Sequence, residues 1–279
     1  MRRPERPLPG RALTATVLAV VVLCSASCSR PEFLRPSIDS QLSDIYESRV
    51  PINGSRRGNS GTLDVQLYNG RQKLAAGDPA GARDLAAKAL QINEKSAPAH
   101  TLMAVSLDQL GNSAVAGQHY LRAAELDPTR GAMLNNYGTW LCGNGRAAES
   151  LDWFDQALQD SSYSTPASAL ANAGHCATQA GLAERGGRYL RDALSLDPDS
   201  PVALAALAES EFRAGRAFEA RAFSQRRLAA APADAQSLLL ASQIEEKLGD
   251  KDAAASYVQR LRAEFPGAAG SETGDGSKR

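Results

Sequence analysis

The chain has 279 residues, of which 22% are charged, 43% hydrophobic and only 5% aromatic, and its formal net charge is zero. Removing residues 1–27, with their four arginines and one glutamate, leaves 27 basic and 30 acidic residues and a net charge of −3. No basic stripe is visible, and there are only seven tyrosines and two tryptophans, so the composition argues against nucleic-acid binding.

Residues 1–27 have the pattern of a secretory signal. A basic segment is followed by an apolar run of 13 residues, 12–24, which is too short to span a bilayer comfortably. The small residues 25–27 and then Cys28 come next, an order typical of bacterial lipoproteins. We therefore expect the signal to be removed before Cys28, whose thiol is then lipidated. Ser29 after the cysteine favours the outer membrane, by analogy with Gram-negative sorting.

Two alternatives to the lipid anchor stay open. Ordinary signal-peptidase cleavage also accepts Ser25 and Ser27, and it would leave a soluble periplasmic protein with a free cysteine. An uncleaved segment 12–24 would hold the protein in the inner membrane, but that needs a longer apolar run. Residues 28–62, rich in Ser, Pro, Gly and Arg, are predicted to form a lipidated N-terminus and flexible tether.

From residue 63 the sequence repeats itself with a period of 34 residues. The eighth and twentieth positions are always small, as needed where two antiparallel helices approach closely. The fifteenth position is always glycine, which suits a helix C-terminus that needs a positive φ. The six glycines are Gly77, Gly111, Gly145, Gly181, Gly215 and Gly249. The predicted units are residues 63–96, 97–130, 131–166, 167–200, 201–234 and 235–268, the third being two residues longer than the others.

This pattern resembles the tetratricopeptide repeat (TPR), which has the same period and small residues at these positions. One helical hairpin cannot bury its own apolar face, so copies must stack beside it. The expected fold is all-α, a right-handed superhelical TPR solenoid of about six repeats with a concave groove. Residues 269–279 lack apolar periodicity, and we expect a disordered tail there.

No catalytic, metal or cofactor site is predicted. The histidines His100, His119 and His175 lie in different helices without a carboxylate at ligand spacing. His175 adjoins Cys176, but neighbouring residues on a helix point about 100° apart and do not act on one atom. We therefore expect a protein that is not an enzyme and takes no small-molecule substrate.

Cys142 and Cys176 fall in the first helices of units three and four, which lie side by side in a TPR stack. In an oxidising periplasm they are disulfide candidates, and the Cα separation decides the matter. The alternative is that both are small buried hydrophobic residues.

By analogy with the TPR, positions two, five, nine, twelve and thirteen of each first helix face the groove. The residues predicted to bind a protein partner there are Leu67, Arg71, Leu74, Val105, Asp108, Gln109, Asn135, Thr139, His175 and Gln179, with Phe212 and Arg213 further along. Lysines that would clamp a C-terminal carboxylate are missing at position two.

Three segments resemble the type IV pilus biogenesis lipoproteins of the PilF/PilW pilotin family: LNNYGTWLC (134–142), YSTPASALANAGHC (163–176) and DAAASYVQRLRAEFP (252–266). The resemblance implies a non-enzymatic outer-membrane lipoprotein that binds the type IV pilus secretin and promotes its outer-membrane localisation and multimerisation. We expect the groove of the first four units to make that contact. The alternative function is a periplasmic TPR scaffold that docks peptidoglycan-remodelling enzymes, which predicts cell-wall phenotypes with normal twitching motility.

Overall fold

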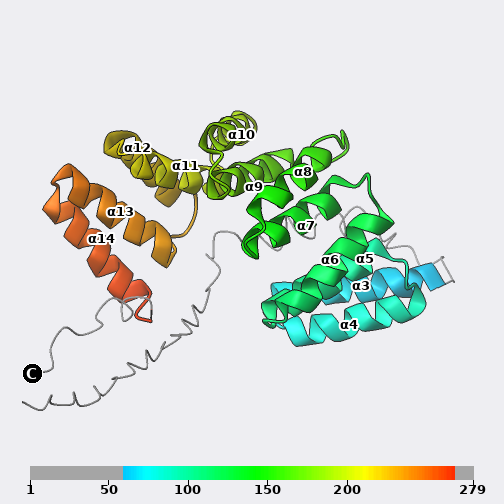
Figure 1. Cartoon of the computed structure of the whole chain (residues 1–279). Coiled ribbons are helices and arrows are strands. Elements are labelled where there is room, and N and C mark those ends of the chain that lie inside the picture. The colour runs from blue at the N-terminus through cyan, green and yellow to red at the C-terminus, as the bar shows by residue number, and fades with distance from the viewer. Residues whose placement is uncertain (1–58, 268–279) are drawn as a thin grey trace, which may run out of the picture.

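A computed structural model describes residues 59–267. This part of the chain contains twelve α-helices and no strand, arranged as a curved row of hairpins (Figure 1). The helices are α3 (Asn59–Ala75), α4 (Pro79–Ile92), α5 (Ala97–Gln109), α6 (Ser113–Leu126), α7 (Gly131–Gly143), α8 (Ala147–Ala157), α9 (Pro166–Gln179), α10 (Ala183–Leu196), α11 (Pro201–Arg213), α12 (Ala217–Ala230), α13 (Ala235–Leu248) and α14 (Lys251–Glu264).

Consecutive helices pair as α3–α4, α5–α6 and so on to α13–α14, and each hairpin packs against the next. The expected all-α solenoid is confirmed. All six predicted turn glycines have positive φ angles, from 73° at Gly77 to 84° at Gly249. At the first of these turns the Gly77 N–H donates to the Leu74 carbonyl over 3.0 Å, and the chain can then reverse. A side chain at this φ would strain the backbone, which explains the glycine period.

The described residues do not include the predicted signal, Cys28, the first part of the predicted tether or the predicted tail. Helix α3 begins at Asn59, inside the segment 28–62 that was predicted as tether. None of the helices within residues 59–267 combines the length and the apolar character that crossing a bilayer would need.

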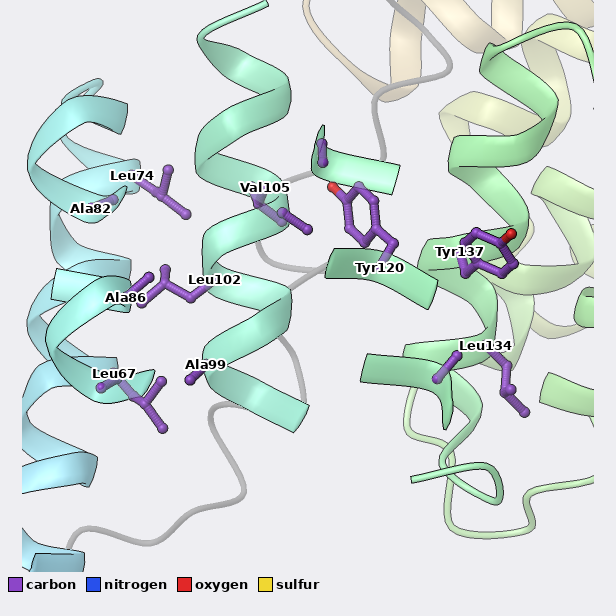
Figure 2. Close-up of a cluster of buried hydrophobic side chains, with 14 of the residues drawn as sticks. Leu67, Leu74, Ala82, Ala86, Ala99, Leu102, Val105, Tyr120, Leu134 and Tyr137 are labelled. Carbon is purple, nitrogen blue, oxygen red and sulfur yellow. The ribbon is translucent and has the colours of Figure 1, made fainter. Parts of the chain in front are cut away.

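The core of the first three repeats is built from leucines set against alanines. Leu67, Leu74 and Leu102 are at most 3% exposed, and they pack with Ala82 and Ala86 of α4 (Figure 2). Methyl-sized residues on one helix let the next helix approach closely enough for each leucine to be fully enclosed. The apolar interior therefore runs between hairpins as well as within them.

The loop after α8, lengthened by the two-residue insertion, returns to the start of α7. Arg130, which precedes α7, gives it no side-chain cap. Asp160 takes that role from the loop: its carboxylate accepts from the Gly131 N–H over 2.8 Å and from the Ser162 N–H over 2.9 Å. A Cβ on Gly131 would come within 2.8 Å of Tyr163 Cγ, so the loop rests directly on a glycine.

We expect Asp160→Ala to lower the free energy of unfolding by about 0.5–2 kcal/mol, because the Gly131 N–H loses its acceptor at the positive end of α7. Asp160→Asn keeps an oxygen there and serves as the matched control.

Hydrogen bonds from Ser162 and Gly131 lower the pKa of Asp160. The carboxylate therefore stabilises the fold above its unfolded pKa of about 4, and this contribution is lost as the pH falls through the lower folded value. Urea unfolding at pH 7 and at about pH 3 measures both effects. Equal midpoints for wild type and Asp160→Ala at pH 7 would contradict the capping role.

Arg227 stands where earlier units carry alanine, and it joins two repeats. Arg227 is 8% exposed. Its guanidinium donates to the Ala231 and Pro232 carbonyls over 3.3 and 3.2 Å and pairs with the Asp234 carboxylate over 2.6 Å. Asp234 in turn caps α13 by accepting from the Ser237 N–H over 2.7 Å. The larger residue thus fastens the end of α12 to the start of α13.

Candidate functional site

The predicted groove residues of the first two repeats are largely inside the protein. Leu67 and Leu74 of α3 and Val105 of α5 are 3%, 1% and 1% exposed and belong to the core cluster in Figure 2. The expectation that they line an open groove is therefore wrong. The cause is the close packing of α3 against α4 and α5, which turns these positions toward the neighbouring helices.

The polar residues predicted beside them are also partly covered. Arg71 is 4% exposed, and Asp108 and Gln109 are half-buried on α5. None of the three lines the surface cavity between the loops 127–130 and 159–162, or the cavity on α9, α11 and α13 that is described below. The first two repeats thus offer little accessible surface at the predicted positions.

In the middle of the solenoid, Asn172 of α9 binds two predicted groove residues of α7. The Asn172 amide donates to the Asn135 side-chain oxygen over 3.1 Å and to the Thr139 hydroxyl over 3.3 Å. Asn135 is fully buried, and Thr139 is 6% exposed. Hydrogen-bonded polar groups at such depth fix the helices in one register, because a shifted helix would leave them unpaired.

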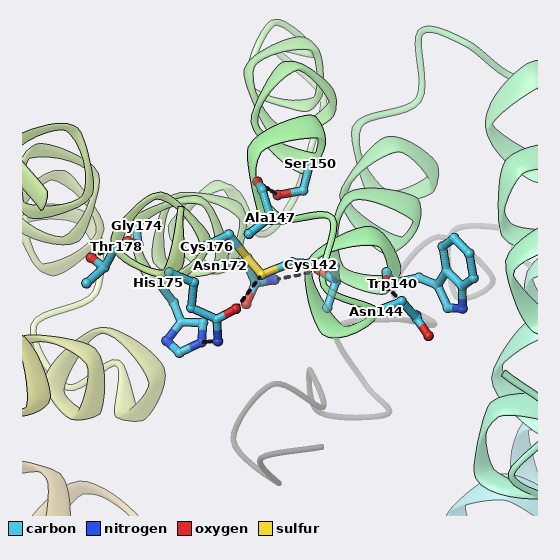
Figure 3. Close-up of a disulfide and its surroundings, with 12 residues drawn as sticks. Trp140, Cys142, Asn144, Ala147, Ser150, Asn172, Gly174, His175, Cys176 and Thr178 are labelled. Atoms are coloured by element: carbon cyan, nitrogen blue, oxygen red, sulfur yellow. Dashed lines mark hydrogen bonds between the residues drawn. A yellow bond between two sulfur atoms is a disulfide. The ribbon is translucent and has the colours of Figure 1, made fainter. Parts of the chain in front are cut away.

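Cys142 of α7 and Cys176 of α9 form a disulfide, as predicted, with their Cα atoms 5.8 Å apart (Figure 3). Both cysteines are buried, at 2% and 0% exposure. Helices α7 and α9 share few other direct contacts, and α8 packs against both of them. The covalent bond therefore ties the third repeat directly to the fourth.

His175 and Gln179 lie one turn apart on α9, next to this bond. The Gln179 amide nitrogen is 2.7 Å from His175 Nε2, so the amide donates and the imidazole nitrogen accepts. Burial, with a smaller effect of the Arg213 charge, lowers the pKa of His175 to about 4. The imidazole is consequently neutral at neutral pH, although it lies beside charged groups of the next repeat.

An open cavity of about 210 Å³ begins at these two residues and extends over α11 to the start of α13. Its wall includes the ion pair between Arg213 and Glu209, 2.5 Å apart. The full lining is His175, Thr178, Gln179, Ala206, Glu209, Arg213 and Gln236. Amides, a neutral imidazole and a paired charge can hydrogen-bond to a polypeptide backbone or a polar side chain. Small-molecule sites usually enclose about 300–1,000 Å³ of mostly apolar space, so this cavity suits part of a protein partner better.

Three residues that the sequence predicts for the groove line this cavity: His175, Gln179 and Arg213. The other residues of its wall are not among the predicted groove residues. Thr178, Glu209 and Gln236 occupy positions twelve, nine and two of their first helices. The positional rule for TPR grooves would have found them if it had been applied to every unit. Within residues 59–267, no group of three His, Cys, Asp or Glu side chains comes together as a set of metal ligands.

No protein-family model matches the chain. It is 26% identical over 211 residues to the type IV pilus assembly protein PilF of Pseudomonas aeruginosa, a match that covers 76% of this chain and 84% of PilF. The solved structure of that PilF has a TM-score of 0.65 and covers 76% of this chain and 95% of its own. The crystal structure of PilW, a widely conserved type IV pilus biogenesis factor, has a TM-score of 0.67 at 28% identity and covers 74% of this chain and 96% of PilW.

A tetratricopeptide repeat protein from Parabacteroides merdae is 16% identical, with a TM-score of 0.60 over 82% of this chain and 86% of its own, and this likeness supports the fold alone. The chain is thus a TPR protein. Its predicted resemblance to the PilF/PilW proteins of type IV pilus biogenesis is confirmed in both sequence and structure.

Proposed function

We propose that this chain acts in type IV pilus biogenesis as a non-catalytic, protein-binding TPR module. The observation that carries the proposal is the likeness to PilF and PilW along about three quarters of the chain and nearly the whole of those structures. Since the curvature of a solenoid follows from how its repeats stack, this likeness supports a concave surface on the same side of the stack.

The finer proposal is that of a pilotin. A lipid on Cys28 would hold the protein on the periplasmic face of the outer membrane, and the cavity on α9, α11 and α13 would bind a segment of the type IV pilus secretin. This would promote secretin localisation and multimerisation. The cavity supports this view because its wall comes from three successive repeats. A surface that spans several repeats suits an extended polypeptide.

The test is the state of the secretin, monomer or heat-stable multimer, in outer membranes of a deletion strain. We expect multimers to be lost, and to return with the wild-type gene but not with Cys28→Ala. A gene that carries Arg213→Glu should also fail to restore the multimers, because the substitution removes the partner of Glu209 and places two carboxylates in the cavity wall. Arg188→Glu is the matched control: it reverses one exposed charge on α10, away from the cavity.

Unchanged multimers in the deletion strain would refute the pilotin proposal, and cell-wall defects in the same strain would then point to the scaffold alternative. Normal multimers with Arg213→Glu, in a strain that loses them on deletion, would instead move the partner site away from this cavity. Cys28→Ala that restores multimers would refute the lipid anchor alone.

A further inference from the structure

Two histidines of the second repeat face each other at the surface, far along the solenoid from the proposed partner site. His100 lies on α5 and His119 on α6, and both are half-buried. Their Nδ1 atoms are 2.8 Å apart, and the ring centroids are separated by 5.1 Å. No local sequence pattern indicates this pair, because the two histidines are 19 positions apart in the chain and only the hairpin brings them together.

The contacts define where the protons sit. His100 Nε2 lies 3.0 Å from the Glu94 carbonyl oxygen, which only accepts, so Nε2 carries a proton. In neutral His100 the Nδ1 atom is then an acceptor, and His119 Nδ1 must donate to it. His119 Nε2 is left with a lone pair, and among the described residues nothing hydrogen-bonds to it.

Both imidazoles are predominantly neutral near neutral pH. Burial lowers the pKa of both His100 and His119, and the charge of Arg122 lowers that of His100 further. His119 is also affected by His100 itself, since two positive rings in contact repel each other. Neutral imidazole nitrogens are the form that binds transition metals.

We infer that His100 and His119 form a surface site for a divalent first-row transition-metal ion of the Ni²⁺ or Cu²⁺ type. When the His119 proton moves from Nδ1 to Nε2, both Nδ1 lone pairs become available, and the ion binds beside the line that joins the two nitrogens. No proton is released in this step. Water fills the remaining coordination positions.

The spacing of the two nitrogens favours this class of ion. With metal–nitrogen bonds of about 2.0–2.1 Å, two nitrogens 2.8 Å apart subtend an angle near 90° at the ion. The two lone pairs point at each other in the free pair, so each imidazole ring turns toward the ion when it binds. That angle is the one between neighbouring ligands in square-planar and octahedral complexes, which suit Ni²⁺ and Cu²⁺, whereas tetrahedral Zn²⁺ needs the nitrogens further apart. Hard ions such as Ca²⁺ and Mg²⁺ prefer oxygen ligands and are not expected to bind.

Arg122 is the charged group that acts against the ion. It lies one turn after His119 on α6, and its guanidinium is already paired with Glu125 over 3.1 Å. Replacing it with glutamine should strengthen metal binding, since the positive charge near His100 disappears. This variant tests the site in the direction opposite to that of the histidine variants.

Calorimetric titration of the full chain with Ni²⁺ tests the proposal. We expect one ion per chain at this site, and a roughly tenfold or greater loss of affinity in His100→Gln and in His119→Gln, because each leaves a single ligand and removes the benefit of a second, preplaced one. Arg122→Gln should bind more tightly than wild type. Circular dichroism shows whether the variants keep their helices.

Footprinting on the wild-type chain gives a readout that needs no variant. Diethyl pyrocarbonate modifies accessible unprotonated imidazoles, so Ni²⁺ should protect His100 and His119 while leaving the modification of buried His175 unchanged. Failure of millimolar Ni²⁺ to protect the pair would overturn the inference. So would Ni²⁺ affinity that stays the same in both histidine variants, since the ion would then lie elsewhere on the chain.

Discussion

Replacing Phe154 with alanine is expected to lower the free energy of unfolding by about 3–5 kcal/mol, the usual range for a fully buried phenylalanine. Phe154 lies on α8 and has no exposed surface. It packs with Leu151 and Ala177 and with both disulfide cysteines in one apolar cluster. A truncated side chain would therefore leave a cavity at the junction of the third and fourth repeats.

The cavity is expected to stay open, which places the loss toward the upper end of this range. The Phe154 ring fills the space that a side chain at Gly138 would occupy, since a Cβ there would come within 3.0 Å of the ring. The backbone of α7 would have to move to close the gap, and the disulfide from α7 to α9 opposes that movement. Cavity cost rises with the volume that cannot collapse.

Phe218→Ala is the matched control, because Phe218 also lies on a second helix of a hairpin but is 74% exposed. It should change the stability by no more than about 0.5 kcal/mol. Guanidinium unfolding followed by circular dichroism measures both variants. A loss below about 1 kcal/mol for Phe154→Ala would mean that the repeat junction is more loosely packed than the structure indicates.

The double variant Cys142→Ala/Cys176→Ala is expected to lose about 3–4 kcal/mol, from the chain entropy that a bridge across 34 residues removes from the unfolded state. In a solenoid each repeat contacts only its neighbours, so local opening at one junction separates two halves. The bridge lies at such a junction, and without it the third and fourth repeats should part at lower denaturant concentration.

Reductant provides the internal comparison for the disulfide. Dithiothreitol should lower the unfolding midpoint of the wild-type chain and leave the double variant unchanged. Reduced wild type keeps both sulfur atoms in the core, so any remaining difference between it and the double variant measures their packing alone. A wild-type midpoint that does not respond to complete reduction would contradict the stabilising role.

The Phe154 and disulfide effects should not add. Phe154 and the two cysteines share one cluster, and removing the bridge would let α7 and α9 relax into the cavity. We expect the triple variant to lose less than the sum of the separate losses, which the same unfolding experiment measures.

The sequence alone determined the repeat architecture, because the features that encode it are local. A glycine that must adopt a positive φ, as Gly77 does, leaves its mark at every turn, and small residues mark each close helix contact. The disulfide was also predictable, since the repeat period places Cys142 and Cys176 on neighbouring first helices. In both cases the repeat period predicts which residues lie next to each other in space, because equivalent helices of successive repeats are neighbours.

Only the tertiary structure decided which side chains are accessible and which distant ones meet. Leu67 and Val105 occupy groove positions by number, yet they are buried, because burial depends on how far each neighbouring helix leans in. The Asp160 cap on α7 and the contact between His100 and His119 join residues 29 and 19 positions apart. Such pairs depend on loop path and hairpin register, which no local pattern records.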